Sequence, residues 1–322
     1  HRRSLEWDMD EHERDPQAAT GASGVGEVHD APRVEERVAL SDDDGLEHGS
    51  HEDGRPINRN LIYNNPEKWE IGRQILERYT GTPPEGMQKQ ILLTNFEYYS
   101  ERFSGMADDV VTTRGSTMTA RHSERLGVSL VNFSVGSPVA ALIIEVLATA
   151  EPKATLFLGM CGGLHRSLEV GDFVLPTAAI RDEGASQHFM PPQVPALPTF
   201  KVQKFVSQII VERGLDYRTG VIHTTDTRFW EFNEGFKQRL YDERALGIDM
   251  ETATLFSVGF ASKVPIGALL LVSDLPLKRG GIKTRESARS VFREHTDRHI
   301  EIGIAAMSQI EERGEHIRHY RW

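Results

Sequence analysis

Short runs that are apolar throughout alternate with helical patterns along most of the chain, and this alternation limits the fold more than any other feature. A strand whose residues do not alternate between polar and apolar is buried on both faces. The pattern therefore predicts an α/β fold in which helices cover both sides of a parallel or mixed sheet. We expect strands at 90–94, 116–122, 128–135, 154–159, 172–180, 217–224, 245–249 and 266–273, and helices at 66–80, 138–150, 201–213, 233–243, 251–262 and 286–312.

The acidity of the chain belongs to its first segment. Residues 1–54 carry 16 acidic and 5 basic side chains, a net charge of −11, which is also the net charge of the whole chain. We therefore expect residues 1–58 to be a disordered acidic tail and residues 59–322 to form a catalytic domain. His48 and His51 have no neighbours that would complete a set of metal ligands, so we expect no metal site.

Composition also excludes several classes of protein. The single cysteine, Cys161, cannot form an intrachain disulfide and fits a cytoplasmic location. No run of about 18 apolar residues is present, so we expect no membrane span. The body outside the tail has no net charge and no basic stripe, which argues against a nucleic-acid partner.

Two carboxylates interrupt the apolar stretch "GIDMETATLF". Asp249 ends a predicted strand and Glu251 opens a predicted helix, where the exposed N–H groups favour an anion. Capping of the helix is the simpler interpretation. A pair of acids at a strand end also suits a sugar diol, with Met250 as an apolar wall beneath the ring.

Another strand ends at "VSDLPLK", where Ser273 and Asp274 precede the strand-breaking Pro276. Partial burial in a cleft would raise the pKa of the Asp274 carboxyl and suit it to donate a proton near neutral pH. A turn-capping role is the alternative.

Glycines and aromatic residues mark two further strand ends. The glycines of "LFLGMCGGL", including Gly162, indicate close approach by a ligand or by another segment of the chain. The aromatic residues of "HTTDTRFWEF" could stack on a heterocyclic base or could belong to the core, and the sequence favours neither interpretation. This stretch supplies Asp226, Arg228, Phe229 and Trp230 as candidates. His295 and His299 are expected at the surface.

Taken together, five stretches resemble the nucleoside phosphorylase/nucleosidase family over roughly residues 88–312. The matches are "GMCGGL" at 159–164, "GDFVLPTAAIRDEG" at 171–184, "TTDTRFWE" at 224–231, "IDMETAT" at 248–254 and "VSDLPLK" at 272–278. The resemblance implies a three-layer α/β fold whose central mixed sheet is partly barrel-like. It favours the AMP-cleaving branch of the family, which works without a cofactor.

For that branch the resemblance implies hydrolysis of the N-glycosidic bond of AMP to adenine and ribose 5-phosphate. Asp274 matches the acid that protonates purine N7, and Glu251 matches the residue that holds the ribose hydroxyls. Met250 and Ser273 belong to the same motifs and are expected to contact the substrate. Asp249 is expected to support the junction.

The chain departs from related phosphorylases, which carry an arginine and a serine in the strand-end motif that binds phosphate. Phe157 and Met160 stand at those places. Loss of the charged contact costs about 1.5–3 kcal/mol, so water is favoured as the nucleophile. Tyr99 stands where a hydrolase would place the base that orients this water.

Cations near the strand ends are candidates for binding the 5′-phosphate. Ser137, which follows Gly136 and precedes a proline-opened helix, is a further candidate through backbone N–H groups. Family members are commonly hexamers, so we expect a homohexamer, and cations of a neighbouring subunit are candidates too. The cations considered are Arg181, Lys278, Arg279 and Lys283 within the subunit, and Arg114, Arg121 and His122 from a neighbour.

Two other functions remain open at this level. A purine nucleoside phosphorylase would require phosphate for turnover, and a non-catalytic nucleotide-binding protein would bind AMP without releasing adenine.

Overall fold

The computed structural model describes residues 60–313. The acidic segment, with His48 and His51, lies outside the described residues, as does the C-terminal end of the chain. The helices are α1 (Pro66–Thr80), α2 (Glu97–Phe103), α3 (Ser137–Leu147), α4 (Phe200–Glu212), α5 (Glu234–Asp242), α6 (Thr252–Ala261) and α7 (Arg285–Glu312). The strands are β1 (Gln90–Thr94), β2 (Val111–Arg114), β3 (Thr119–Ser123), β4 (Val128–Asn132), β5 (Ala154–Gly163), β6 (Phe173–Asp182), β7 (Arg218–Thr225), β8 (Gly247–Asp249) and β9 (Ile266–Asp274).

Within the described residues the strands form one nine-stranded sheet in the order β2-β3-β4-β1-β5-β8-β7-β6-β9. Strand β9 pairs with β6 and also with β5, so the strands β5, β8, β7, β6 and β9 close into a ring. Parallel pairs such as β1–β5 and antiparallel pairs such as β6–β9 both occur. The predicted mixed, partly barrel-like sheet is confirmed.

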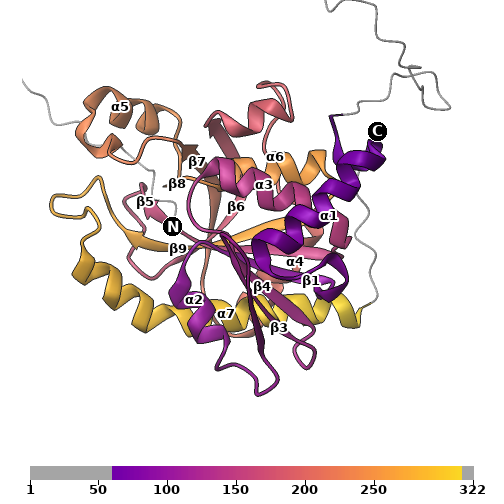
Figure 1. Ribbon diagram of the computed structural model, residues 1–322. Coiled ribbons are helices and arrows are strands. Elements are labelled where there is room, and N and C mark those ends of the chain that lie inside the picture. Colours follow the sequence, from indigo (N-terminus) through magenta and orange to yellow (C-terminus); the bar gives the residue numbers. More distant parts are fainter. Residues whose placement is uncertain (1–59, 314–322) are drawn as a thin grey trace, which may run out of the picture. The chain divides into compact units, whose positions relative to one another are not determined.

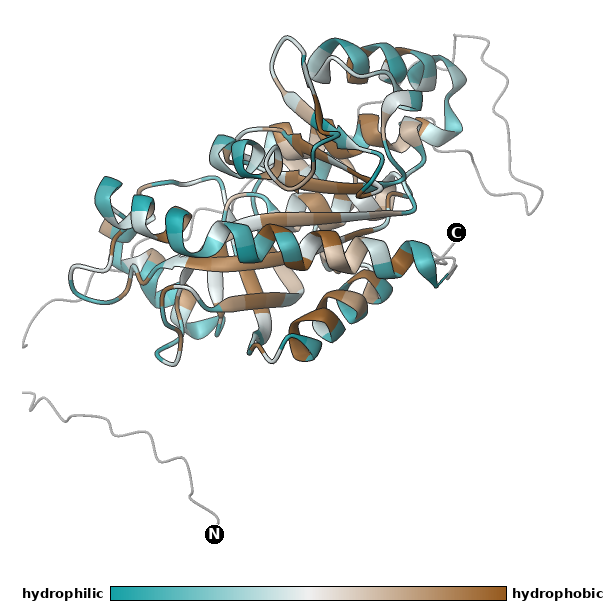
Figure 2. Cartoon of the chain, turned by 90° about the horizontal axis from the view of Figure 1, so that it is seen from below, coloured by the Kyte–Doolittle hydropathy of each residue, from teal (hydrophilic) through white to brown (hydrophobic). Residues whose placement is uncertain are grey.

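Helices cover both sides of the sheet, as the apolar strands predicted (Figure 1). Strand β1 shows how one strand serves two cores. Leu92 packs in the core beneath α2, α4 and α7, whereas Ile91 and Leu93 pack in the core beneath α1, α3 and α6. Most of the strand residues are accordingly hydrophobic, while many helix residues are hydrophilic (Figure 2).

Local signals set several element ends. The Asn65 side chain caps α1 by accepting a hydrogen bond from the backbone N–H of Lys68 at 3.1 Å, and Gly81 ends this helix in the left-handed conformation at φ 76°. The predicted hairpin is present as the antiparallel pair β3–β4. Strand β5 runs on to Gly163, further than its apolar run alone predicted.

One strand and one α-helix of the described residues were not predicted. Strand β2 has the sequence "VTTR", and its side chains are mostly exposed, so no apolar run marks it. Helix α2 has only 7 residues, too few to show a clear helical period. None of the helices within residues 60–313 has both the length and the apolar character that crossing a membrane requires.

Candidate active site

A cavity of about 210 Å³ lies where β5, β7, β8 and β9 end. Strand β8 pairs antiparallel with the end of β5 through Gly162–Ile248 and Gly163–Gly247, so the three residues of β8 lie beside the last residues of β5. Strand β7 runs parallel to β8, and β9 runs parallel to β5, which brings their carboxyl ends to the same place. Many of the predicted site residues line this cavity: Gly162, Arg228, Trp230, Met250, Glu251, Ser273 and Asp274.

Asp274, the last residue of β9, is the predicted proton donor. Its Oδ1 accepts a hydrogen bond from the Ser273 hydroxyl at 2.6 Å. Burial raises the pKa of the Asp274 carboxyl, while the Ser273 hydrogen bond and the nearby charges of Lys283 and Arg228 act in the opposite direction. The carboxyl therefore keeps its proton to a higher pH than an exposed aspartate, as a general acid requires.

Glu251 lies at the β8–α6 junction and is buried. Its Oε1 accepts a hydrogen bond from the backbone N–H of Gly136 at 2.8 Å, and the Asn95 side chain also hydrogen-bonds to it. Burial, together with the charge of Asp249, raises the pKa of Glu251 to about 8. Glu251 is thus held in place by the protein while it faces the cavity beside Met250.

Asp249 supports the junction, as the sequence suggested. Its Oδ1 accepts a hydrogen bond from the Thr224 hydroxyl at 2.7 Å, and its Oδ2 accepts one from the backbone N–H of Thr252 at 2.9 Å. Thr224 in turn accepts a hydrogen bond from the backbone N–H of Ala253. Burial raises the pKa of the Asp249 carboxyl. These contacts attach the first turn of α6 to β7. They thereby also hold Glu251, which directly precedes α6, in position.

Gly136 and Ser137 do not line the cavity, so the expected anion site at the start of α3 is not supported. The backbone N–H of Gly136 is used by Glu251. The Ser137 hydroxyl donates a hydrogen bond to the backbone carbonyl of Met250 at 2.7 Å. Both residues position the Met250–Glu251 corner.

Some residues of the segment after β7 line the cavity and others do not. Trp230 is buried against Leu240 and Ile248, and its ring stacks on Phe236 with centroids 5.7 Å apart, so it is a core residue with one side at the cavity. Phe229 is 74% exposed and does not line the cavity, so its predicted contact with the base is not supported.

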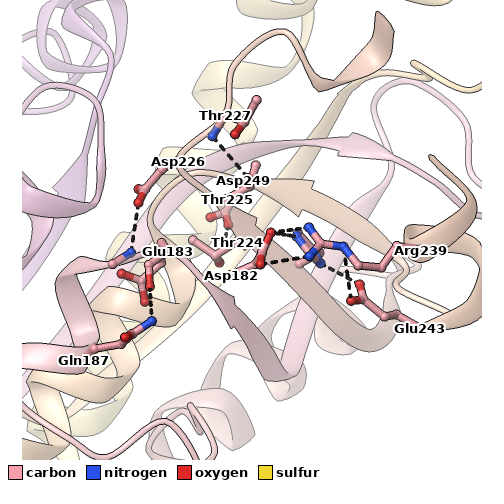
Figure 3. A network of polar contacts seen from close by, with 12 residues as sticks. Asp182, Glu183, Gln187, Thr224, Thr225, Asp226, Thr227, Arg239, Glu243 and Asp249 are labelled. Carbon is pink, nitrogen blue, oxygen red and sulfur yellow. Dashed lines mark hydrogen bonds and ion pairs between the residues drawn. The ribbon is translucent and has the colours of Figure 1, made fainter. Parts of the chain in front are cut away.

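Asp226 also points elsewhere. Its Oδ2 accepts a hydrogen bond from the backbone N–H of Gly184 at 2.9 Å, outside the cavity (Figure 3). The predicted contact between Asp226 and substrate is therefore not supported, since the carboxylate ties the end of β7 to the loop after β6.

A charged cluster anchors α5 behind this segment. Arg239 of α5 bridges Asp182 and Glu243 (Figure 3). The ring of buried His223 lies between the same two carboxylates, with Nδ1 2.7 Å from Glu243 and Nε2 3.2 Å from Asp182. The cluster joins α5 to β6 and β7, and so holds the turn that carries Arg228 and Trp230.

Arg181 is not available for a phosphate. Its guanidinium donates hydrogen bonds to the Ser186 hydroxyl and to the backbone carbonyls of Met190, Pro191 and Val194. Arg181 does not line the cavity. Its role is to hold the loop after β6. The carbonyls of this loop accept the hydrogen bonds that the guanidinium would otherwise donate to a phosphate.

Lys278 lines a neighbouring cavity of about 660 Å³ rather than the one that holds Glu251. Ser273 and Asp274 form part of the wall of both cavities. The predicted contact between Lys278 and substrate is therefore not supported within the subunit.

Asn95 and Glu231 line the cavity although the sequence analysis did not single them out. Asn95, which follows β1, hydrogen-bonds to Glu251, and Glu231 contributes a buried carboxylate. Lys283, one of several cations considered for the phosphate, lies with its Nζ 5.6 Å from the ring centroids of both Phe96 and Phe292. Burial lowers the pKa of Lys283. No motif marks Asn95 or Lys283, whereas Glu231 closes the stretch "TTDTRFWE".

The two positions that depart from the phosphate motif are apolar in the structure as well. Phe157 is fully buried, and its ring centroid lies 5.9 Å from that of Phe133. Met160 lines the cavity and, with Cys161, is buried. Burial raises the pKa of the Cys161 thiol, as expected for a small core residue rather than a nucleophile.

Tyr99 and His299 form a buried pair that does not line the cavity. The Tyr99 hydroxyl lies 2.8 Å from Nδ1 of His299, and His299 Nε2 lies 2.9 Å from the carbonyl oxygen of Leu269. The prediction that His299 is a surface residue is wrong, because these partners compensate its burial. Burial lowers the pKa of His299 to about 3. Tyr99, outside the cavity lining, cannot orient a water there.

The fold and the converging strand ends define a nucleoside-phosphorylase type of protein. A family profile described as "Phosphorylase superfamily" matches residues 93–307. The chain belongs to this family.

Particular relatives carry more specific names. The chain is 31% identical over 286 residues to a protein named AMP nucleosidase from Escherichia coli (strain K12), covering 75% of this chain and 59% of that protein. A crystal structure of AMP nucleosidase from Bacteroides thetaiotaomicron VPI-5482 is 40% identical, with a TM-score of 0.68, and covers 76% of this chain and 98% of that one. Purine nucleoside phosphorylase from Toxoplasma gondii, 19% identical with a TM-score of 0.64 over 72% of this chain and 95% of that one, shares the fold.

Proposed function

We propose that this chain hydrolyses the N-glycosidic bond of AMP, releasing adenine and ribose 5-phosphate. The observation that carries the proposal is that Asp274 and Glu251 face one cavity at the carboxyl ends of β9 and β8. The similarity to proteins named AMP nucleosidase supports the choice of substrate.

In the proposed reaction Asp274 donates a proton to purine N7. Protonation makes adenine a better leaving group as the C1′–N9 bond breaks and the ribose gains oxocarbenium character. The raised pKa of Asp274 supports this role, because a donor must still carry its proton near neutral pH. The hydrogen bond from Ser273 to Oδ1 orients the carboxyl group.

Glu251 holds the ribose hydroxyls in the proposed complex. Its position is fixed by Gly136 and Asn95, so a diol can bind without rearrangement of the side chain. Met250 lines the same wall and provides an apolar surface beneath the sugar. The ligand's hydroxyls would then offset the cost of burying Glu251.

Water is the proposed nucleophile. Phe157 is buried in the core, and Met160 presents an apolar surface to the cavity, so neither can bind an attacking phosphate. A phosphate that meets no charged or hydroxyl partner at these two positions would incur a larger desolvation cost. Water carries no such cost.

The 5′-phosphate needs cations that the ribose end does not supply. Of the described residues that line the cavity, the cations are Arg228 and Lys283, and both lie near Asp274, at the base end. We therefore propose that the active enzyme is a homohexamer in which a neighbouring subunit completes the phosphate site. We also propose that it works in the cytoplasm. Arg114, which is exposed on β2, is a candidate. Arg121 and His122 are engaged by Glu97 and Ser129 of their own subunit.

Product analysis tests the function directly. The purified chain is incubated with AMP, adenosine and IMP, each with and without phosphate, and bases and sugars are separated by chromatography. We expect adenine and ribose 5-phosphate from AMP in phosphate-free buffer. Turnover that requires phosphate would identify a phosphorylase, and AMP binding without adenine release would identify a non-catalytic nucleotide-binding protein. Light scattering measures the oligomer, for which a monomer would contradict the proposed assembly.

A further inference from the structure

Glu231 has a buried carboxylate at the cavity, and one of its two oxygens has no hydrogen-bond partner among the described residues. Only 3% of its side chain is exposed, and the residue lines the cavity. Its Oε1 accepts a hydrogen bond from Arg228 Nη1 at 2.8 Å. Its Oε2 is buried and has no hydrogen-bond partner among the described residues.

An unpaired buried carboxylate oxygen is costly, by about 1–3 kcal/mol or more for a charged group. Such a group is retained where a ligand donor completes its hydrogen bonding. A carboxylate oxygen accepts hydrogen bonds, so the missing partner is an N–H or O–H of the ligand.

The surroundings place Glu231 at the base end of the cavity. Arg228 pairs with Glu231, and its charge also acts on Asp274, so the two carboxylates lie near the same guanidinium. Glu251 and Asn95 form the ribose end. A donor that reaches Glu231 therefore belongs to the base rather than to the sugar.

We propose that Glu231 determines the specificity for the base by accepting a hydrogen bond from the exocyclic 6-amino group of adenine. This inference rests on the proposed function, in which Asp274 meets N7. The 6-amino group lies next to N7 on the purine ring. It is a donor, and it can therefore pair with the free oxygen of a carboxylate whose other oxygen is held by Arg228.

The same contact rejects 6-oxopurines. In hypoxanthine an acceptor oxygen replaces the amino group, so two acceptors face each other in a buried site and Oε2 remains unpaired. Sites built to hydrogen-bond one substrate group discriminate strongly against analogues that lack it. We expect AMP to be preferred over purine ribonucleoside 5′-monophosphate, which lacks the amino group, by at least about tenfold in kcat/KM.

The test combines a change in the enzyme with a change in the substrate. kcat/KM is measured for AMP, purine ribonucleoside 5′-monophosphate and IMP with the unmodified chain, with Glu231→Gln and with Glu234→Gln. In Glu231→Gln the amide oxygen can still accept from Arg228, but the amide N–H₂ turns toward the base. Glu234 is exposed and pairs with Lys237 only three residues away, so its variant is the matched control.

We expect Glu231→Gln to reduce the preference in kcat/KM for AMP over the analogue lacking the amino group to about twofold or less. The ratio of kcat/KM for IMP to that for AMP should rise by about tenfold or more. Glu234→Gln should change neither quantity. An unchanged preference in Glu231→Gln would overturn the proposal. A preference of the unmodified chain for IMP that this variant loses would show instead that Glu231 accepts from N1–H of a 6-oxopurine, and would overturn it too.

Failure of the proposed function has a different signature. If the unmodified chain releases no base from AMP, the hydrolase assignment fails, and the Glu231 contact is then decided by calorimetry with adenine and unsubstituted purine. Stronger binding of adenine that Glu231→Gln abolishes supports the contact. Equal binding of the two bases, or no binding of either, overturns it.

Discussion

The backbone N–H of Gly136 donates a hydrogen bond to Oε1 of Glu251 over 2.8 Å and joins the start of α3 to the β8–α6 junction. Gly136 has φ 108° and ψ 151°, a conformation that residues with a side chain rarely adopt. Space is not the constraint, because a Cβ at this position would have only Pro138 Cδ, at 3.9 Å, within reach. The backbone conformation itself therefore requires glycine.

Gly136→Ala should lower the free energy of unfolding by on the order of 1–3 kcal/mol, because alanine would be strained at this φ. The variant should also bind AMP more weakly, since relief of the strain moves the donor that holds Glu251. Urea denaturation and the KM for AMP measure the two effects. Gly105→Ala is the control, because Gly105 has no positive φ and its nearest neighbour to a Cβ is 3.5 Å away. Equal stability of the two variants would contradict the strain argument.

Glu251 predicts how stability depends on pH. Its pKa is about 8 in the folded protein and 4.5 as an ordinary glutamate, so the folded state holds its proton more tightly. The stabilisation linked to this proton is fully present below the ordinary pKa and is lost as the pH rises through the folded pKa. The amide of Glu251→Gln does not titrate. The free energy of unfolding of this variant, relative to that of the unmodified chain, should therefore rise between about pH 5 and pH 8.

Urea unfolding at a series of pH values measures this difference. Asp249 and Asp274 also have raised pKa values, so both proteins lose some stability with rising pH, and the informative quantity is the gap between them. The exposed Glu234→Gln variant should keep a constant gap over the same range. A constant gap for Glu251→Gln would show that its pKa is not raised by folding.

Much of the fold could be predicted because apolar runs report burial directly. Strands such as β1 and β9 are buried along nearly their whole length, and the sequence shows this without reference to any partner. The register that closes the ring could not be predicted in the same way. It depends on β9 pairing with both β5 and β6, which are far from β9 along the chain.

Asp274 and Glu251 were singled out because each is an acidic residue beside an apolar run at a strand end, and both line the cavity. The prediction of site residues failed where function depends on which partner a polar group finds. Arg181 is a cation near a strand end, yet it binds three backbone carbonyls of the following loop. His299 finds Tyr99, 200 residues away, and is buried as a result. Such pairings depend on tertiary contacts that no local pattern encodes.

Asp274→Asn should leave AMP binding nearly intact and lower kcat by on the order of 10²-fold or more, because the amide is close in shape but cannot supply the proton. In the unmodified chain kcat should fall as the pH rises through the raised pKa of Asp274. Asp226→Asn is the control, because this carboxylate also follows a strand end but lies outside the cavity. Equal kcat in Asp274→Asn and the unmodified chain would remove Asp274 from the mechanism.

Arg181→Met separates a structural role from phosphate binding. The guanidinium makes hydrogen bonds to Ser186 and to three carbonyls of the loop, and methionine would leave these acceptors without a donor. We expect the free energy of unfolding to fall by about 2 kcal/mol or more, with the KM for AMP changed less than about threefold. Arg218→Met, which removes an exposed arginine with a single 3.4 Å contact to the Tyr217 carbonyl, should change neither quantity. A tenfold rise in KM at unchanged stability would instead show that Arg181 binds the phosphate, and that the loop contacts give way when substrate enters.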